Sequence, residues 1–144
     1  MDKIEHHYNY LTSTIAEAAA APLSSRKALL ATLLLDGFVD RLAGDADVLA
    51  FRASLAATSP DLALVIDIAA QRLHLVIEAV AVPLDRVHTL SEADFMVSVY
   101  NDGTVQRVRV ALPDGGRRDV HEVLAAALAA LGPAVDRARA MPHP

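Results

Sequence analysis

Apolar residues recur at helical spacing between residues 59 and 82 and predict the central element of the chain. Six of them are separated by four and three residues in turn, which places them on one side of a helix: Leu62, Ile66, Ala69, Leu73, Val76 and Val80. Ser59 is a favourable N-cap, and Pro60 suits a first turn, where its missing N–H costs no hydrogen bond. We therefore predict a helix over 60–82. Residues 73–82 are rich in Val and Ile, so a strand is the alternative for this half.

A narrow line of polar residues follows the opposite side of this predicted helix. Its members are Asp67, Gln71, His74 and Glu78. His74 and Glu78 are four residues apart and can aim at one point from a helix surface, which is compatible with a ligand or metal site. The other interpretation is a solvent-exposed stripe. We favour the stripe, because no second histidine or carboxylate motif completes a set of metal ligands.

Three further helices are predicted before this one. Helical spacing of Ile4, Tyr8, Leu11, Ile15 and Ala18 predicts the first, over about residues 3–21. The second begins at Ser24 or Ser25 and reaches about Leu42, and a short third contains Phe51 and Arg52.

The second predicted helix carries two distinct features. Residues 28–35 are apolar on every side except at Thr32, so this half is expected to lie in the core. Asp36 and Asp40 fall on one face near its end. Paired carboxylates can act as acid and base or bind a cation, but we expect a solvated face.

Turn signals and β-branched residues dominate the chain after a connection over 84–93. Gly103 and its neighbour Asp102 form a strong hairpin signal, and residues 113–116 supply a second turn. We predict an antiparallel meander with strands near 94–101, 104–112 and 116–119. A short helix starting at Ser91 is the alternative to the first of these strands, because Ser91 and Asp94 have capping-box spacing.

Four arginines are expected on this meander. Arg107 and Arg109 alternate with valines on the middle strand and therefore share a face, and the second turn brings Arg117 and Arg118 alongside. Guanidinium groups bind phosphate or carboxylate in a bidentate manner, and they also contact RNA backbones. The alternative, which we favour, is a solvated surface whose charge prevents edge pairing. Aromatic residues for base stacking are scarce here.

A C-terminal helix over 120–132 completes the predicted fold. Asp119 and Glu122 have capping-box spacing, and Gly132 followed by Pro133 marks its end. Residues 133–144 contain few apolar side chains and are expected to fray. The sequence thus predicts one mainly helical α+β domain over 1–144, with a helical bundle over 1–82 and a meander over 83–119.

Composition narrows the functional classes. The chain has 144 residues, 53% of them hydrophobic, and this apolar excess indicates association with itself or with a partner. A net charge of −5 argues against nonspecific nucleic-acid binding by the whole molecule, although it leaves room for a local basic patch. The absence of cysteine fits a reducing compartment, and the polar N-terminus and short apolar runs predict neither secretion nor a membrane span. The excess of arginine over lysine is typical of a GC-rich bacterial genome.

No phosphate-binding loop, nucleophile elbow or HExxH motif occurs in the sequence. We therefore predict no cofactor, and an enzyme is only the third hypothesis. The first hypothesis is a cytoplasmic bacterial interaction module that forms a homodimer or binds a protein partner. The second is a binding protein for a small anionic or metal ligand, which would use either the polar line or the four arginines.

Overall fold

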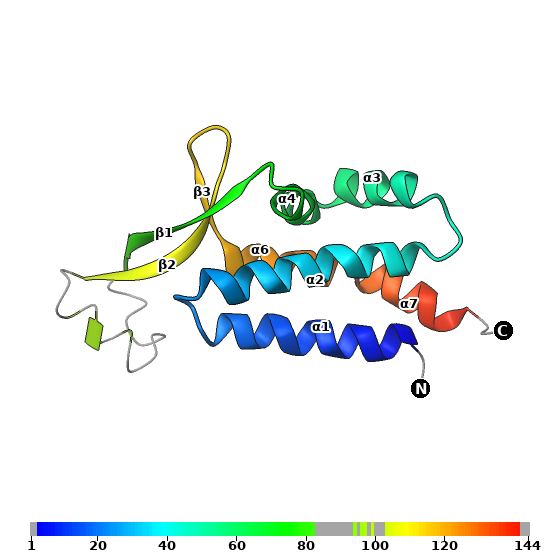
Figure 1. Ribbon diagram of the computed structural model, residues 1–144, viewed down its shortest axis with the longest axis horizontal. Helices are drawn as coiled ribbons and strands as arrows, with labels where there is room; N and C mark the ends of the chain where they lie inside the picture. Colours follow the sequence, from blue (N-terminus) through cyan, green and yellow to red (C-terminus); the bar gives the residue numbers. More distant parts are fainter. Residues whose placement is uncertain (1–2, 83–93, 95, 98, 100–102, 142–144) are drawn as a thin grey trace.

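A three-stranded antiparallel sheet and a larger set of helices make up the fold, which confirms the predicted α+β, mainly helical class. The computed structural model describes residues 3–82, 94, 96–97, 99 and 103–141. In chain order its elements are α1 (Lys3–Ala19), α2 (Ser25–Ala43), α3 (Val48–Thr58), α4 (Pro60–Ala69), β1 (His74–Ala81), β2 (Thr104–Ala111), β3 (Arg117–Asp119), α6 (Val120–Ala130) and α7 (Gly132–Ala140) (Figure 1).

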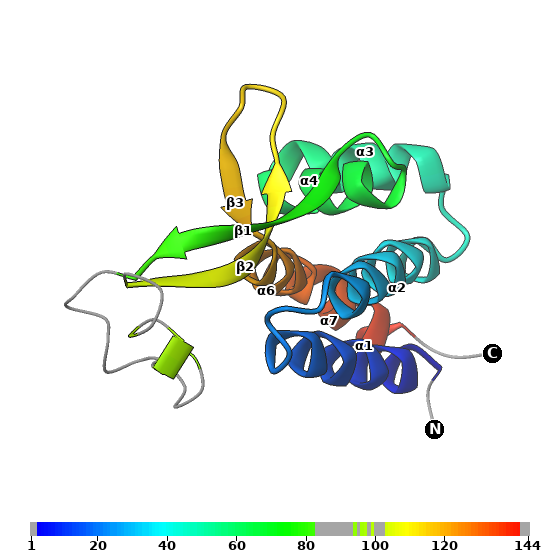
Figure 2. The same cartoon turned by 60° about the vertical axis from the view of Figure 1, so that its left-hand side comes forward.

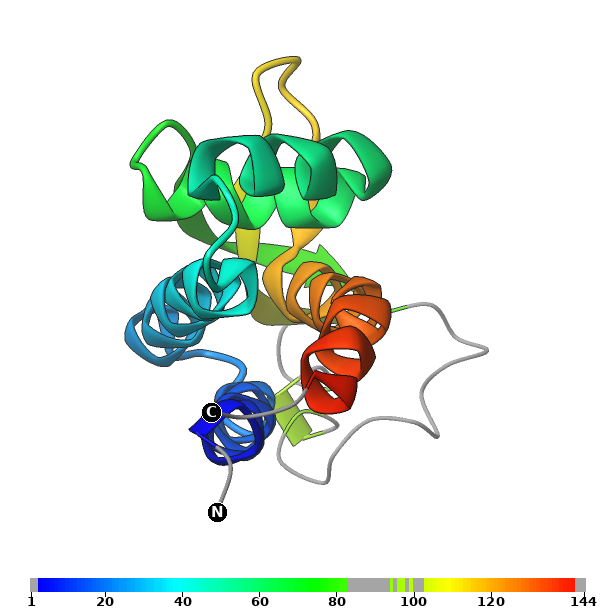
Figure 3. The same cartoon turned by 90° about the vertical axis from the view of Figure 1, so that its right-hand side faces the viewer.

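Three of the first four helices begin directly after a capping side chain. Ser24, Asp47 and Ser59 precede α2, α3 and α4, and each side chain accepts a hydrogen bond from a backbone N–H two or three residues later. Helices α1 and α2 run antiparallel, while α3 and α4 lie on the other side of α2 (Figures 1 and 3). Local sequence therefore determines the starts of these helices.

The predicted helix over 60–82 is wrong in its second half. Helix α4 ends at Ala69, and Gln71 takes a left-handed conformation with φ of 62°. The chain then enters β1, which pairs with β2 along its whole length, from His74 opposite Ala111 to Ala81 opposite Thr104. Backbone pairing with a distant strand and the β-preference of Val and Ile outweigh the helical spacing of the apolar residues. The strand alternative for this segment is confirmed.

The sheet has the order β1-β2-β3, and its two longer strands extend beyond the helices (Figure 2). The predicted strands at 104–112 and 116–119 are confirmed as β2 and β3, joined by a turn in which Gly115 has φ of 88°. The predicted strand at 94–101 is wrong. Its described residues, Asp94, Met96, Val97 and Val99, are helical, and β2 pairs with β1 instead. The predicted connection over 84–93 lies outside the described residues.

Helix α6 confirms the predicted C-terminal helix, but the tail that follows is not frayed over its described part. Helix α7 begins at Gly132, because Val135 can be buried against the core, where it is 1% exposed. Near its end, Arg139 donates hydrogen bonds to the carboxylate of Glu5 at 2.6 and 2.8 Å, which fastens α7 to α1. Figure 3 shows these two helices side by side. Residues 142–144 of the predicted tail lie outside the described residues.

One hydrophobic core joins α1, α2, α4, α6 and α7 to one face of the sheet. Its largest fully buried side chains are Leu11, Leu35, Leu62, Leu124, Leu131, Val39, Val65, Val108, Val110, Val120, Val123 and Val135. Within the part of the chain that the structure describes, no helix is both long and apolar enough to cross a membrane.

Candidate functional site

The predicted polar line does not exist as a single stripe, because its four residues lie on three different elements. Asp67 remains on α4 and pairs with Arg72 at 3.0 Å. Gln71 and His74 border a pocket of about 390 Å³ between the start of α2 and the start of β1. Glu78 lies further along β1, where its carboxylate is 3.5 Å from the guanidinium of Arg117.

The strand conformation also separates the two residues that could have shared a metal ion. His74 and Glu78 lie on the same face of β1, but four residues of extended chain place their Cα atoms about 13 Å apart. Among the described residues, no group of three or more histidine, cysteine, aspartate or glutamate side chains is arranged to hold a metal ion. The geometry therefore gives no support to the metal-site hypothesis.

Three of the four predicted arginines share one face of the sheet, here called the arginine face. Arg107 and Arg109 alternate along β2, and Arg117 lies on the same face because it pairs opposite Ala111. Arg118 is a correction to the prediction. It pairs opposite the core residue Val110 and is therefore directed toward the helices, where its guanidinium lies 3.0 Å from Asp61 of α4.

Carboxylates engage most of these guanidinium groups. Arg107 is partly buried and contacts Asp94 at 2.8 and 3.5 Å, so its charge is already matched within the chain. Arg117 donates to the backbone carbonyls of the β2–β3 turn at 3.1 and 3.2 Å and makes only the long contact with Glu78. The arginine face is therefore a mixed surface of both charges rather than the uniformly positive surface that the arginines alone suggest.

A pocket of about 290 Å³ lies on the arginine face where β3 meets the start of α6. Its lining residues are Val80, Arg107, Arg109, Arg117, Arg118, Asp119 and Glu122. In the first turn of α6, both ring nitrogens of His121 are buried and have no hydrogen-bond partner within the described part of the chain. Burial lowers the pKa of His121, and the nearby charge of Arg107 also lowers it, against the opposing effect of Asp119. His121 is therefore neutral at pH 7.

A second candidate surface lies on the outer side of α1 and α2. It consists of Leu30, Leu33, Leu34 and Gly37 of α2 with Tyr10 of α1, and is here called the leucine face. Leu30 is 51% exposed, Leu33 45% and Tyr10 62%, although all three are large and apolar. The expectation that residues 28–35 lie wholly in the core is thus wrong, since α2 buries only one side against α1, α4 and α6.

Charged residues stand at the two ends of the leucine face. Glu17 and Lys27 border its pocket of about 340 Å³, and Arg41 and His7 border its pocket of about 310 Å³. Partial burial lowers the pKa of His7, and the positive charges of Arg41, His6 and Lys3 lower it further, so His7 is neutral at pH 7. One end of the face therefore carries a carboxylate and an ammonium group, and the other carries the guanidinium of Arg41.

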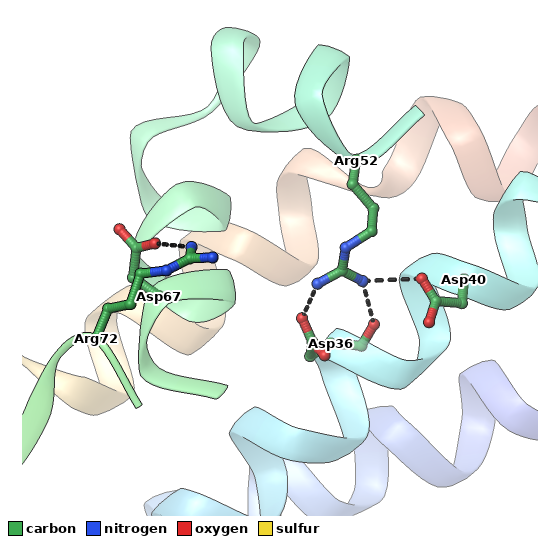
Figure 4. A network of polar contacts seen from close by, with 5 residues as sticks. All are labelled: Asp36, Asp40, Arg52, Asp67 and Arg72. Carbon is green, nitrogen blue, oxygen red and sulfur yellow. Dashed lines mark hydrogen bonds and ion pairs between the residues drawn. The ribbon is translucent and has the colours of Figure 1, made fainter. Parts of the chain in front are cut away.

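The two aspartates of α2 are not a free carboxylate pair. Arg52 of α3 donates hydrogen bonds to the carboxylates of Asp36 and Asp40 and to the backbone carbonyl of Asp36 (Figure 4). The side chains of Arg52 and Asp36 are only 19% and 24% exposed. Burial opposes the charge of Arg52, but both carboxylates outweigh it and raise its pKa. The predicted solvated face is thus an ion-pair cluster that joins α3 to α2.

Replacing Arg52 with alanine is expected to lower the free energy of unfolding by roughly 1–3 kcal/mol, because Asp36 would lose its partner while still partly buried. Helix α3 has no fully buried residue, so this ion-pair cluster adds to the attachment that the partly buried Phe51 and Leu55 provide. Urea unfolding monitored by circular dichroism measures the change.

Arg72→Ala is the matched control for Arg52→Ala. The Arg72 side chain is 68% exposed and pairs with Asp67 at 3.0 Å (Figure 4), so its loss should cost less than about 0.5 kcal/mol. Equal effects of the two substitutions would show that the Arg52 cluster contributes no more than an ordinary surface ion pair.

The sequence indicated only part of these surfaces. Asp119 was visible as a helix cap but not as a pocket residue, although the turn over 112–116 already places it opposite Arg109. The exposure of Leu30 and Leu33 had no local signal, because an all-round apolar segment also fits a buried helix. Comparison of the chain with protein-family models, with curated proteins and with solved structures found no match.

Proposed function

We propose that this chain is a small cytoplasmic bacterial interaction module that forms a homodimer through the leucine face. The observation that carries the proposal is the row of apolar side chains that α2 exposes opposite its core side, with Leu30 and Leu33 about half exposed. Exposed apolar residues that lie together on one face are typical of protein interfaces, whereas scattered ones are normal on any surface. The high apolar content of the chain supports the same conclusion.

A second copy of α2, running antiparallel, fits the shape of the leucine face. The two pockets on this face share Leu34, so a twofold axis near Leu33 and Leu34 would place the Leu30 end of one copy against the Gly37 end of the other. A Cβ added at Gly37 would meet nothing within 4 Å, so the backbone there is open to a close approach. Such self-complementary contacts are the ordinary basis of dimers with twofold symmetry.

Glu17 and Arg41, which lie at opposite ends of the face, favour the same antiparallel arrangement. Neither Glu17 nor Arg41 forms an ion pair with another described residue. Antiparallel packing would bring Glu17 of one copy toward Arg41 of the other, twice in each dimer. Complementary charges at the rim of an interface fix its orientation more than its strength.

Sedimentation velocity at micromolar concentrations tests the proposal. Wild-type protein is expected to be a dimer, and Leu33→Glu is expected to weaken the dimer at least about 100-fold, because a carboxylate would be buried in an apolar contact. Leu49→Glu is the matched control. Leu49 is 79% exposed on α3 and lies away from the leucine face, so this variant should remain dimeric.

The same assay tests the orientation. Glu17→Arg and Arg41→Glu should each weaken the dimer, and the double variant should restore it, because the reversed charges again face each other. Circular dichroism confirms that each variant is folded. A monomeric wild type, or a Leu33→Glu variant that dimerises like the wild type, would contradict the leucine face as the interface.

A further inference from the structure

Two opposite charges face each other across β2 and β3 without pairing. Arg109 and Asp119 are register partners on the arginine face, where opposite side chains lie close enough to interact. They form no ion pair with each other, however, and each leaves a buried polar atom without a hydrogen-bond partner among the described residues, Nε of Arg109 and Oδ1 of Asp119. Arg109 uses one other nitrogen to donate to the backbone carbonyl of Arg117 at 3.2 Å.

Unsatisfied buried polar atoms are costly and rare in folded proteins, so a pair of them on one pocket wall calls for a partner. Both residues line the pocket of about 290 Å³ on the arginine face. Glu122 of α6 lines it as well and forms no ion pair with any described residue. The pocket therefore offers the guanidinium of Arg109 close to the carboxylates of Asp119 and Glu122, and none of the three forms an ion pair with another described residue.

The charge balance distinguishes between ligand classes. The other lining arginines, Arg107, Arg117 and Arg118, each have a carboxylate partner within the chain, at 2.8, 3.5 and 3.0 Å. Phosphate or another dianion would meet Arg109 but also lie beside Asp119 and Glu122, whose like charge would repel it. A molecule with a carboxylate and an ammonium group matches both the guanidinium of Arg109 and the carboxylates of Asp119 and Glu122. The volume lies just below the usual range for pockets that bind drug-sized ligands, which fits a single amino acid.

We infer that the pocket between β2, β3 and the start of α6 binds a small zwitterion of the α-amino acid class. The ligand carboxylate accepts a charge-assisted hydrogen bond from the guanidinium of Arg109, and the ammonium group donates to the carboxylates of Asp119 and Glu122. This site is separate from the leucine face, so it stands whether or not the chain dimerises.

Isothermal titration calorimetry with a panel of free L-amino acids tests the inference. At least one amino acid should bind, and two matched half-ligands should bind at least about tenfold more weakly: the carboxylic acid that lacks the amine and the amine that lacks the carboxylate. Inorganic phosphate should give no heat. If phosphate or a simple carboxylate bound as tightly as any amino acid, the pocket would be an anion site and the proposed zwitterion ligand would be wrong. The absence of binding by the whole panel at millimolar concentration would overturn the site itself.

Variants assign the binding to this pocket. Arg109→Gln and Asp119→Asn keep a polar side chain but remove its charge, and Asp119 makes no side-chain capping hydrogen bond to α6 that Asn would lose. Each should weaken binding at least about tenfold. Glu122→Gln, at an exposed position, should also weaken it without affecting the fold. Arg72→Gln lies outside the pocket and should bind like the wild type. Unchanged affinity in folded Arg109→Gln protein would overturn the assignment.

Discussion

Replacing Val135 with aspartate is expected to lower the free energy of unfolding by roughly 3–5 kcal/mol, because it buries an unpaired carboxylate. Val135 lies on α7, is 1% exposed and belongs to the hydrophobic core. Its helix also contacts α1 through Arg139, whose guanidinium lies 5.2 Å from the ring centroid of Tyr8 as well as pairing with Glu5. Urea unfolding monitored by circular dichroism measures the loss.

Pro133→Asp is the control for this prediction. It adds the same carboxylate to the same helix, but at an exposed position in the first turn, where the helix dipole favours negative charge. We expect a change within about 1 kcal/mol. If Val135→Asp were no more destabilising than Pro133→Asp, α7 would not be packed on the core, and the frayed tail predicted from sequence would be correct.

Replacing Leu124 with alanine is expected to lower the free energy of unfolding by about 2–5 kcal/mol, since it leaves a cavity where α6 meets α4, α1 and α2. Leu124 has no exposed surface. The same urea titration measures the change, and an unchanged dependence on denaturant concentration would show that the folded and unfolded states remain comparable.

Leu49→Ala is the control for Leu124→Ala, because Leu49 is 79% exposed on α3 and alanine suits a helix. Its cost should be below about 0.5 kcal/mol. Similar losses from the two substitutions would contradict the position of Leu124 at the centre of the core. By comparison, Ile66 and Leu73, which helical spacing places on the core side, are only partly buried.

The sequence predicted some parts of the candidate surfaces correctly and missed others. Alternation along β2 correctly placed Arg107 and Arg109 on one face, and the turn brought Arg117 to the same face. Arg118 was misplaced, because adjacent strand residues point to opposite faces and only the register shows which of the two joins the others. The carboxylates that pair with these arginines come from other segments, so their presence could not be predicted locally.

The sequence by itself determined the local features of this protein. Capping residues such as Ser24, Asp47 and Ser59 determine where helices begin, because the hydrogen bonds that they make reach only two or three residues along the chain. Gly115 likewise defines the β2–β3 turn, since its positive φ suits glycine.

Some segments have a sequence pattern that is compatible with two conformations, and only the tertiary structure decided which one forms. Residues 74–81 become a strand because β2 provides backbone partners, and residues 132–140 become a helix because the core provides a site for Val135. The tertiary structure also decided which side chains of α2 are exposed. Residues 28–35 are apolar on nearly every side of the helix, but the neighbouring helices cover only one side. The opposite side remains available for a second copy of the chain. These features are determined by pairing and packing between segments that are distant in the sequence, so the spacing of residues along the chain cannot predict them.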